Sequence, residues 1–232
     1  RNLLARSSNL AKIGVRNQAL ARKPIVAAQV RFVHERGYND VQDVPATIFH
    51  QVNMAMNGAK TCPSYAYIFE TYSDYLTDFQ ISYAFQELAL DKVERTPEFW
   101  NVILPKVKEQ VPTLDRQCTQ SLHGIIAGAG LMQLQDNVLW EALESKLVDE
   151  GLLRYFNVQE AAEILYYFAQ CGRGSDELID QMEKTFIQNK KALVGMDDTL
   201  WYLREGFSQL NKGSEILKKV LEDPEVELPK LE

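Results

Sequence analysis

Cysteine, glycine and proline are scarce in this 232-residue chain, and each scarcity excludes a class of protein. Three Cys are too few for a disulfide-stabilised secreted scaffold, and they lie too far apart in the chain to form a CxxC pair. Twelve Gly and eight Pro are too few for collagen or for a low-complexity linker. Apolar residues make up 46% of the chain and charged residues 25%, which is the composition of a folded globular protein.

Histidine is equally scarce, and the residue patterns of known metal and catalytic sites are missing. The three His are far apart and no HExxH or EF-hand spacing occurs, whereas metal ligands come at short, regular spacings. We therefore predict no metal site, no cofactor and no catalytic residue, and we expect the Cys to be small buried hydrophobes. Spacing alone leaves a Cys–His nucleophile pair open as the alternative. The residues concerned are His34, His50, His123, Cys62, Cys118 and Cys171.

Two further patterns favour structural roles. Residues 171–175 read Cys-Gly-Arg-Gly-Ser, but they lack the Lys of a phosphate loop and follow a predicted helix where a strand is required. We expect a glycine-rich helix end and turn there. The adjacent acids Asp176-Glu177 and Asp197-Asp198 lie at predicted helix ends, where capping and solvation explain them better than acid–base catalysis.

No stretch is apolar enough to cross a membrane. The longest segment without a charge covers residues 117–135, but it contains several Gln together with Thr, Ser and His. A spanning helix needs about 20 predominantly apolar residues, so we predict association with a membrane only through partners. Gly124 and Gly128 form a GxxxG motif in this segment, which we interpret as close packing between helices.

Acidic residues are nearly missing from residues 1–36. Glu35 is the one acid among eight bases, so this segment carries a net charge of +7, whereas residues 37–232 carry 17 bases and 31 acids, a net charge of −14. The apolar residues Leu3, Leu10, Ile13 and Leu20 fall near one side of a helix. The eight bases are Arg1, Arg6, Lys12, Arg16, Arg22, Lys23, Arg31 and Arg36.

A basic, acid-poor and amphipathic segment is typical of mitochondrial targeting sequences. We therefore interpret residues 1–36 as a mitochondrial targeting leader and expect the protein in the mitochondrion, on the matrix side of the inner membrane. Removal on import and retention in an assembly are both compatible with this composition. The alternative is a basic arm that binds nucleic acid or anionic lipid.

Strand signals are nearly absent from the rest of the chain, and helix signals are dense. Good N-cap residues precede apolar segments at helical spacing, and Gly, Asn-Gly or Pro follows them. We expect an all-α fold, in which Thr77 and Gln80 form a capping box that divides one long aromatic segment. The predicted helix starts are Asp43, Ser64, Thr77, Thr96, Thr113, Asp136, Asn157, Ser175, Asp197 and Ser214.

Every second helix start recurs at a regular interval. Thr96, Asp136, Ser175 and Ser214 follow one another at spacings of 40, 39 and 39 along the chain. A helix–turn–helix unit that repeats at about 40 residues is the signature of an α-solenoid, in which each hairpin buries its apolar face against a neighbour. We expect an N-terminal helical hairpin over residues 41–76, four helical-hairpin repeats over residues 77–223 and an extended C-terminal arm over residues 224–232.

Paired helices with short capped turns, in a chain with an organellar leader, resemble the octotricopeptide and heptatricopeptide repeat proteins of mitochondria. These families include the repeat portions of RAP-domain and FAST-kinase-like proteins. The resemblance covers residues 77–223 and rests on the period and the helix caps. We expect no RAP domain, because too short a segment follows Asp223. The resemblance implies a scaffold that binds RNA or protein.

The charge of the body favours protein over RNA. An RNA-binding repeat needs a basic groove, but residues 37–232 are acidic. Trp100, Trp140 and Trp201 lie on apolar helix faces, so we expect them in the core. We predict a non-catalytic accessory subunit of an oxidative-phosphorylation complex, either the respiratory chain or ATP synthase. An RNA-binding factor of mitochondrial RNA metabolism or of the mitochondrial ribosome is the alternative.

Aromatic residues are unusually frequent in residues 65–85. Tyr72, Tyr75, Phe79 and Tyr83 recur at spacings of 3, 4 and 4, which predicts one helical face. Tyrosine is enriched at protein interfaces because it combines a large apolar body with a polar tip. The predicted partner interface consists of Tyr65, Tyr67, Phe69, Tyr72 and Tyr75.

Overall fold

The computed structural model describes residues 46–227, and this part of the chain is all-α, as the sequence predicts. It contains ten α-helices, and no strand occurs among the described residues. None of these helices has the length and apolar character needed to span a bilayer. The basic segment 1–36 and the predicted helix start at Asp43 lie outside the described residues.

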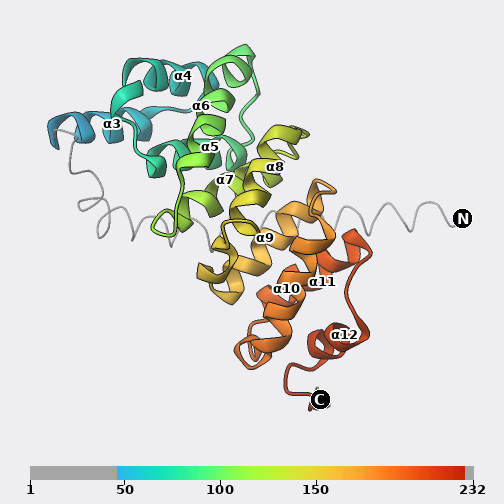
Figure 1. Ribbon diagram of the computed structural model, residues 1–232. Coiled ribbons are helices and arrows are strands. Elements are labelled where there is room, and N and C mark those ends of the chain that lie inside the picture. Colours follow the sequence, from blue (N-terminus) through green and yellow to red (C-terminus); the bar gives the residue numbers. More distant parts are fainter. Residues whose placement is uncertain (1–45, 228–232) are drawn as a thin grey trace, which may run out of the picture. The chain divides into compact units, whose positions relative to one another are not determined.

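The helices follow one another with short connections (Figure 1). Helices α4 to α12 belong to one structural unit, which begins at His50. The α-helices are α3 (Ala46–Gly58), α4 (Cys62–Thr71), α5 (Asp78–Leu90), α6 (Leu104–Gln110), α7 (Thr119–Leu131), α8 (Asn137–Leu147), α9 (Val158–Gln170), α10 (Asp176–Gln188), α11 (Asp197–Leu210) and α12 (Glu215–Glu222). The 3₁₀ turns are η1 (Ser73–Tyr75), η3 (Val111–Thr113), η4 (Leu152–Tyr155) and η5 (Lys190–Leu193), and a π-helical turn, η2 (Phe99–Ile103), leads into α6.

From α5 onward the helices alternate between two sets. The first set, α5, α7, α9 and α11, packs side by side in that order, and we call it the first-helix row. The second set consists of η2–α6, α8, α10 and α12, and α10 packs against α12. Figure 1 shows this succession running from the α4–α5 end to the α11–α12 end. The unit is therefore an array of helix pairs.

One type of turn closes the first helix of all four pairs. Lys92, Gln133, Gly172 and Asn211 adopt left-handed backbone conformations with φ of 51°, 50°, 63° and 52°, at regular spacings of 41, 39 and 39 along the chain. The N–H of the next residue donates to a carbonyl five positions earlier, which together with the left-handed residue makes a Schellman motif. These bonds join Val93 to Leu88, Leu134 to Ala129, Arg173 to Phe168 and Lys212 to Phe207, at 2.9–3.0 Å.

Most of the predicted helix caps are confirmed. The side chains of Asp136, Asn157, Ser175 and Ser214 each accept a hydrogen bond from the N–H three positions later. Thr77 forms the predicted capping box with Gln80. The turn at residues 171–175 is the predicted glycine-rich helix end, because Gly172 takes the left-handed position.

Two predicted helix starts are wrong. Thr61, not Ser64, is the N-cap of α4, and Ser64 is its capping-box partner. Thr113 lies in the η3 turn, and α7 begins only after Cys118. Here Leu114 is extended, and the Asp115 carboxylate accepts the Gln117 N–H at 2.7 Å, which makes a turn in place of helix.

The predicted single aromatic face is also wrong. Tyr72 and Tyr75 lie beyond the end of α4, whereas Phe79 and Tyr83 lie on α5. Thr77 separates the two pairs, because its backbone is extended and its capping box starts a new helix. Phe79 and Tyr83 alone remain on one face, with ring centroids 6.3 Å apart.

Glycines on two sides of α7 bring the first-helix row together. A Cβ on Gly124 would clash with the Ser82 hydroxyl of α5, and one on Gly128 would lie 2.6 Å from Cδ1 of Phe85. On the α9 side, a Cβ on Gly130 would lie 2.5 Å from Cβ of Tyr167. The interpretation of the GxxxG motif as close packing between helices is confirmed.

Polar contacts between neighbouring pairs repeat with the same interval. The Glu144 carboxylate of α8 accepts the Ser175 N–H at 2.9 Å, and one repeat later the Glu183 carboxylate of α10 accepts the Ser214 N–H at 3.2 Å. Each carboxylate thus satisfies a backbone donor at the N-cap of the next pair's second helix.

Candidate protein-interaction site

The predicted partner interface divides between core and surface. Tyr65 and Phe69 are 3% and 2% exposed, so they belong to the core and not to a partner surface. They lie on α4, which packs against the η2 turn. Tyr72 is partly buried, whereas Tyr67 and Tyr75 are 66% and 40% exposed. The structure therefore leaves Tyr67 and Tyr75 as the exposed aromatic residues of the predicted set.

The prediction that all three Trp lie in the core is confirmed for Trp140 alone, because Trp100 is exposed and Trp201 is partly exposed. Trp140 is 2% exposed and its Nε1 donates to the Leu134 carbonyl at 2.8 Å, but Trp100 is 48% exposed. Both residues stand four positions after their helix starts, Thr96 and Asp136. Trp100 lies in the π-helical turn Phe99–Ile103, whereas Trp140 lies in the regular helix α8. The Arg95 guanidinium lies 5.8 Å from the Trp100 ring centroid.

The three Cys lie in environments that suppress thiolate formation. Cys62 and Cys171 are buried, as predicted, and Cys118 is partly buried. Burial raises the pKa of the Cys118 thiol to about 12 and the pKa of Cys171 to about 11. Among residues 46–227, His, Cys, Asp and Glu side chains do not gather in a group that could hold a metal ion.

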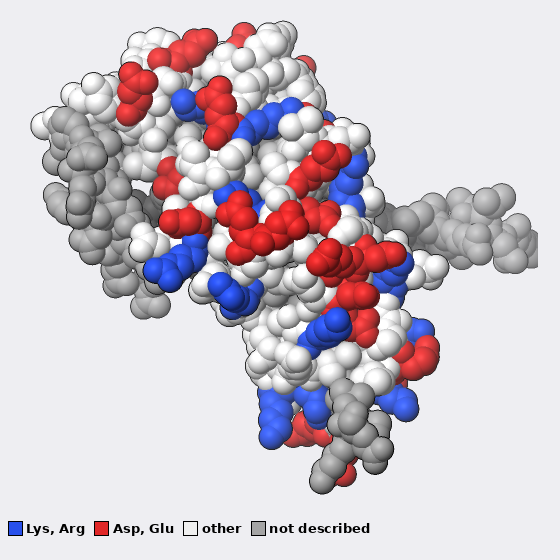
Figure 2. Space-filling view, viewed as in Figure 1, with Lys and Arg blue, Asp and Glu red and all other residues white. Residues whose placement is uncertain are grey.

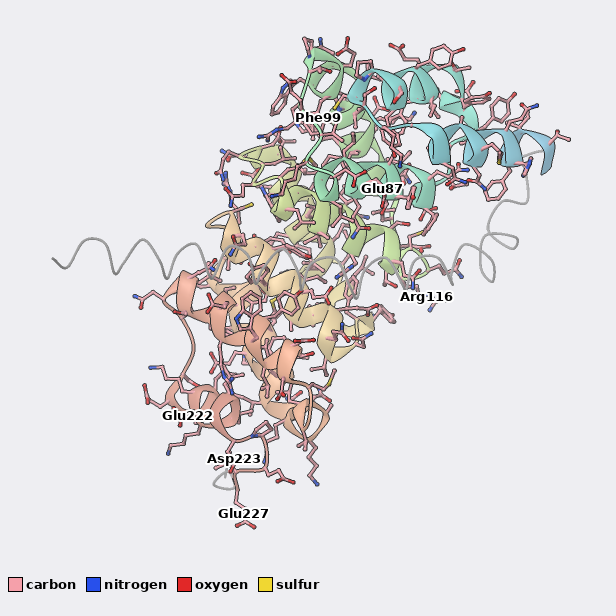
Figure 3. The ribbon with its side chains drawn as sticks, turned by 180° about the vertical axis from the view of Figure 1, so that it is seen from behind. Glu87, Phe99, Arg116, Glu222, Asp223 and Glu227 are labelled. Atoms are coloured by element: carbon pink, nitrogen blue, oxygen red, sulfur yellow. The ribbon has the colours of Figure 1, made fainter. Side chains whose placement is uncertain are left out.

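The first-helix row is acidic. Its four helices contain seven acids and one base, and the base, Arg204, donates to the Leu221 carbonyl at the end of α12. The second helices carry six Lys and nine acids. Figure 2 shows Asp and Glu gathered across the middle of one face, with Lys and Arg beside them. Outside the first-helix row, the acids Glu222, Asp223 and Glu227 lie at the α12 end of the unit (Figure 3). The seven acids are Asp78, Glu87, Glu160, Glu163, Asp197, Asp198 and Glu205.

Aromatic residues accompany these acids on α9 and α11. On α11, Asp198, Trp201 and Glu205 follow one another at spacings of 3 and 4, which places them on one helical face. The Tyr166 ring of α9 lies 5.3 Å from the Trp201 ring and 5.2 Å from the Tyr202 ring, centroid to centroid. We call Asp198, Trp201, Glu205 and Tyr166 the α9–α11 site. Burial and then Glu205 raise the pKa of Tyr166 to about 12, so its hydroxyl is protonated at neutral pH.

A buried polar cluster lies beside this site. The Glu163 carboxylate, 3% exposed, lies 3.1 Å from Nε2 of His123 and accepts a hydrogen bond from Gln159 at 3.1 Å. Burial, followed by the nearby Glu163, raises the pKa of Tyr167 and of Tyr202. The Tyr167 hydroxyl is fully buried and has no hydrogen-bond partner among the described residues. An unmade buried hydrogen bond costs about 1–3 kcal/mol, so this hydroxyl lowers the stability of the folded protein.

Glu87 lies on α5, at the other end of the first-helix row (Figure 3). Its surroundings disfavour the charged form of its carboxyl group. Burial and the neighbouring Asp91 raise the pKa of this carboxyl, and the opposing effect of Lys60 is smaller. Burial and Glu87 in turn raise the pKa of Tyr83. This end of the row therefore also combines aromatic side chains with an acid.

Comparison of the chain with family models and with curated proteins finds no match. The resemblance to octotricopeptide and heptatricopeptide repeats accordingly stays a prediction from the period and the caps.

Proposed function

We propose that this protein is a non-catalytic α-solenoid scaffold that binds other proteins and is built from four helical-hairpin repeats. Four Schellman turns at nearly constant spacing support the repeat assignment, because each occupies the same place in its helix pair. The paired carboxylate contacts of Glu144 and Glu183 support it independently. In a solenoid, each repeat is stabilised by its neighbours, and the long surface that the stacked repeats form together is used for binding.

The observation that carries protein binding over RNA binding is the charge of the first-helix row. RNA affinity comes largely from Lys and Arg that neutralise phosphates. The row carries seven acids, of which Glu163 is buried, and one base, Arg204, which donates to the Leu221 carbonyl. An acidic and aromatic surface is instead suited to a basic protein segment, since charge complementarity steers association and aromatic residues anchor interfaces.

We further propose that the partners are other subunits of a mitochondrial oxidative-phosphorylation complex, either the respiratory chain or ATP synthase, on the matrix side of the inner membrane. The support is the composition of residues 1–36, whose eight bases and single acid are typical of mitochondrial targeting. The role is that of an accessory subunit that fills or decorates the assembly.

The test is native-gel fractionation of detergent-solubilised mitochondria, with mass spectrometry of peptides from this chain. We expect its peptides to comigrate with a respiratory complex or with ATP synthase, in samples treated with RNase as in untreated ones. Migration as a free species of the monomer's size would contradict the subunit assignment. Migration in a particle that RNase disperses would establish the RNA-binding alternative in its place.

A further inference from the structure

We propose that the α9–α11 site binds an arginine side chain on a basic segment of a partner protein. The inference rests on the proposed scaffold function, because the occupant belongs to another protein. It goes further by assigning the contact to four residues and by naming the side chain that they recognise.

The site has the form of an aromatic platform between two carboxylates. Asp198 and Glu205 stand one helical turn to either side of Trp201, on the same face of α11. Trp201 is partly exposed, and Tyr166 of α9 packs against it with a ring-centroid separation of 5.3 Å. The tyrosine holds the indole in place from the neighbouring helix, so the platform is set before any partner arrives.

Both carboxylates are available. Neither Asp198 nor Glu205 has an ion pair or a side-chain hydrogen bond within residues 46–227, whereas Glu163 nearby is engaged by His123 and Gln159. Arg204, on the same helix, directs its guanidinium to the Leu221 carbonyl instead. Two negative charges next to an indole are therefore left without a cation from the described part of the chain.

A guanidinium fits this arrangement better than an ammonium. It is planar and weakly hydrated, so it stacks on an aromatic face and still directs several N–H donors toward carboxylates. Arginine already stacks on aromatic rings elsewhere in the described chain, with Arg95 over Trp100 and Arg154 over Tyr155.

The experiment uses the purified full chain and two end-blocked peptides of equal charge, tetra-arginine and tetra-lysine. Substitution Trp100→Phe removes the most exposed indole, and Trp140 is 2% exposed, so the fluorescence change reports Trp201. We expect the arginine peptide to change this fluorescence and to bind about threefold to tenfold more tightly than the lysine peptide, given the strength of cation–π contacts and surface ion pairs. Equal binding of the two peptides would overturn the inference.

Variants locate the binding site. Labelled tetra-arginine, followed by anisotropy, should bind about threefold or more weakly to Glu205→Gln and to Trp201→Leu. The matched control is Glu141→Gln, which removes one exposed carboxylate from α8 and should leave the affinity within about 1.5-fold of the parent chain. If Glu141→Gln weakens binding as much as Glu205→Gln does, the attraction belongs to the whole acidic surface and the assignment fails. Glu205→Gln decides the question by itself should Trp201→Leu not fold.

The two proposals fail separately. If the chain comigrates with a complex but substitutions in the α9–α11 site do not change peptide binding, the scaffold function is supported and the arginine site is contradicted. If the chain migrates as a free monomer but substitutions in the α9–α11 site weaken arginine binding, the subunit role is contradicted and the arginine site is supported.

Discussion

Gly128 of α7 lies so close to Phe85 of α5 that a Cβ on the glycine would sit 2.6 Å from Cδ1 of the ring. Phe85 is fully buried, so its ring has no free space into which to retreat. The backbone of α7 therefore packs against the Phe85 ring, and this contact limits how closely α5 and α7 approach each other.

We expect Gly128→Ala to lower the free energy of unfolding by about 1–3 kcal/mol, because overpacking a filled core forces side chains or backbone to shift. Urea denaturation followed by far-UV circular dichroism measures the change. The control is Gly58→Ala in α3, where a Cβ would meet no atom within 4 Å. Equal shifts in the two variants would show that the close contact at Gly128 does not limit stability.

The Schellman turns allow a test of backbone strain alone. Gly172 has φ of 63°, and a Cβ there would meet no atom within 4 Å, so Gly172→Ala should cost about 1 kcal/mol through conformation only. Gln133 has φ of 50° at the equivalent turn, so Gln133→Gly should relieve strain and raise the melting temperature. Calorimetry measures the melting temperature of both variants, which should fall for Gly172→Ala and rise for Gln133→Gly. Shifts of the same sign would contradict the shared turn geometry.

Lys146 joins two neighbouring helix pairs through a buried ammonium. Its Nζ donates to the carbonyls of Pro112 and Leu114 at 2.6 and 2.9 Å, and it pairs with Glu150 at 2.8 Å. We expect Lys146→Met to destabilise the protein by about 1–3 kcal/mol, because two carbonyls and a carboxylate lose their donor. Lys184→Met, at an exposed position of α10, should change stability by less than about 0.5 kcal/mol. The urea concentration at the midpoint of unfolding measures the stability of both variants. Similar midpoints for the two variants would refute the role of Lys146.

Glu87 should give a pH-dependent effect. Its pKa in the folded protein lies above the ordinary 4.5, so its contribution is most favourable at low pH, where the group is protonated in both states. That contribution is lost as pH rises from the unfolded pKa through the folded pKa. Glu87→Gln should therefore be more stable than the parent at neutral pH and equally stable at about pH 3.5. Denaturation at both pH values measures the difference. A gain that is the same at both would attribute the effect to packing and not to charge.

The helix caps could be predicted from the sequence because they are local. An N-cap needs one side chain and a donor three positions away, so Asn157, Ser175 and Ser214 could be identified without any tertiary information. Thr113 gave a wrong prediction because Thr is a good N-cap type, whereas the chain there leaves a 3₁₀ turn. With α7 starting after Cys118, the first helices follow Thr77, Cys118, Asn157 and Met196 at spacings of 41, 39 and 39, more regular than the sequence suggested.

The candidate site could be predicted only in part. The spacing of Asp198, Trp201 and Glu205 is visible in the sequence, but Tyr166 joins them from a different helix, through the packing of α9 against α11. The exposure of Trp100 was not predictable from apolar periodicity, because that pattern places the neighbouring Phe99 and Trp100 alike in the core, whereas Phe99 is buried and Trp100 is exposed. Tyr65 and Tyr67 differ by two positions and lie in core and surface, respectively, so composition alone could not separate them.

The carboxylates of Glu144 and Glu183 also give the array a direction. Each lies on a second helix and receives the backbone N–H of a serine that comes later in the chain, in the next pair. During synthesis, the acceptor on α8 or α10 is therefore complete before the ribosome delivers Ser175 or Ser214. The third and fourth helix pairs can therefore each dock onto an acceptor that is already in place, whereas loss of an upstream pair removes the acceptor from the pair that follows it.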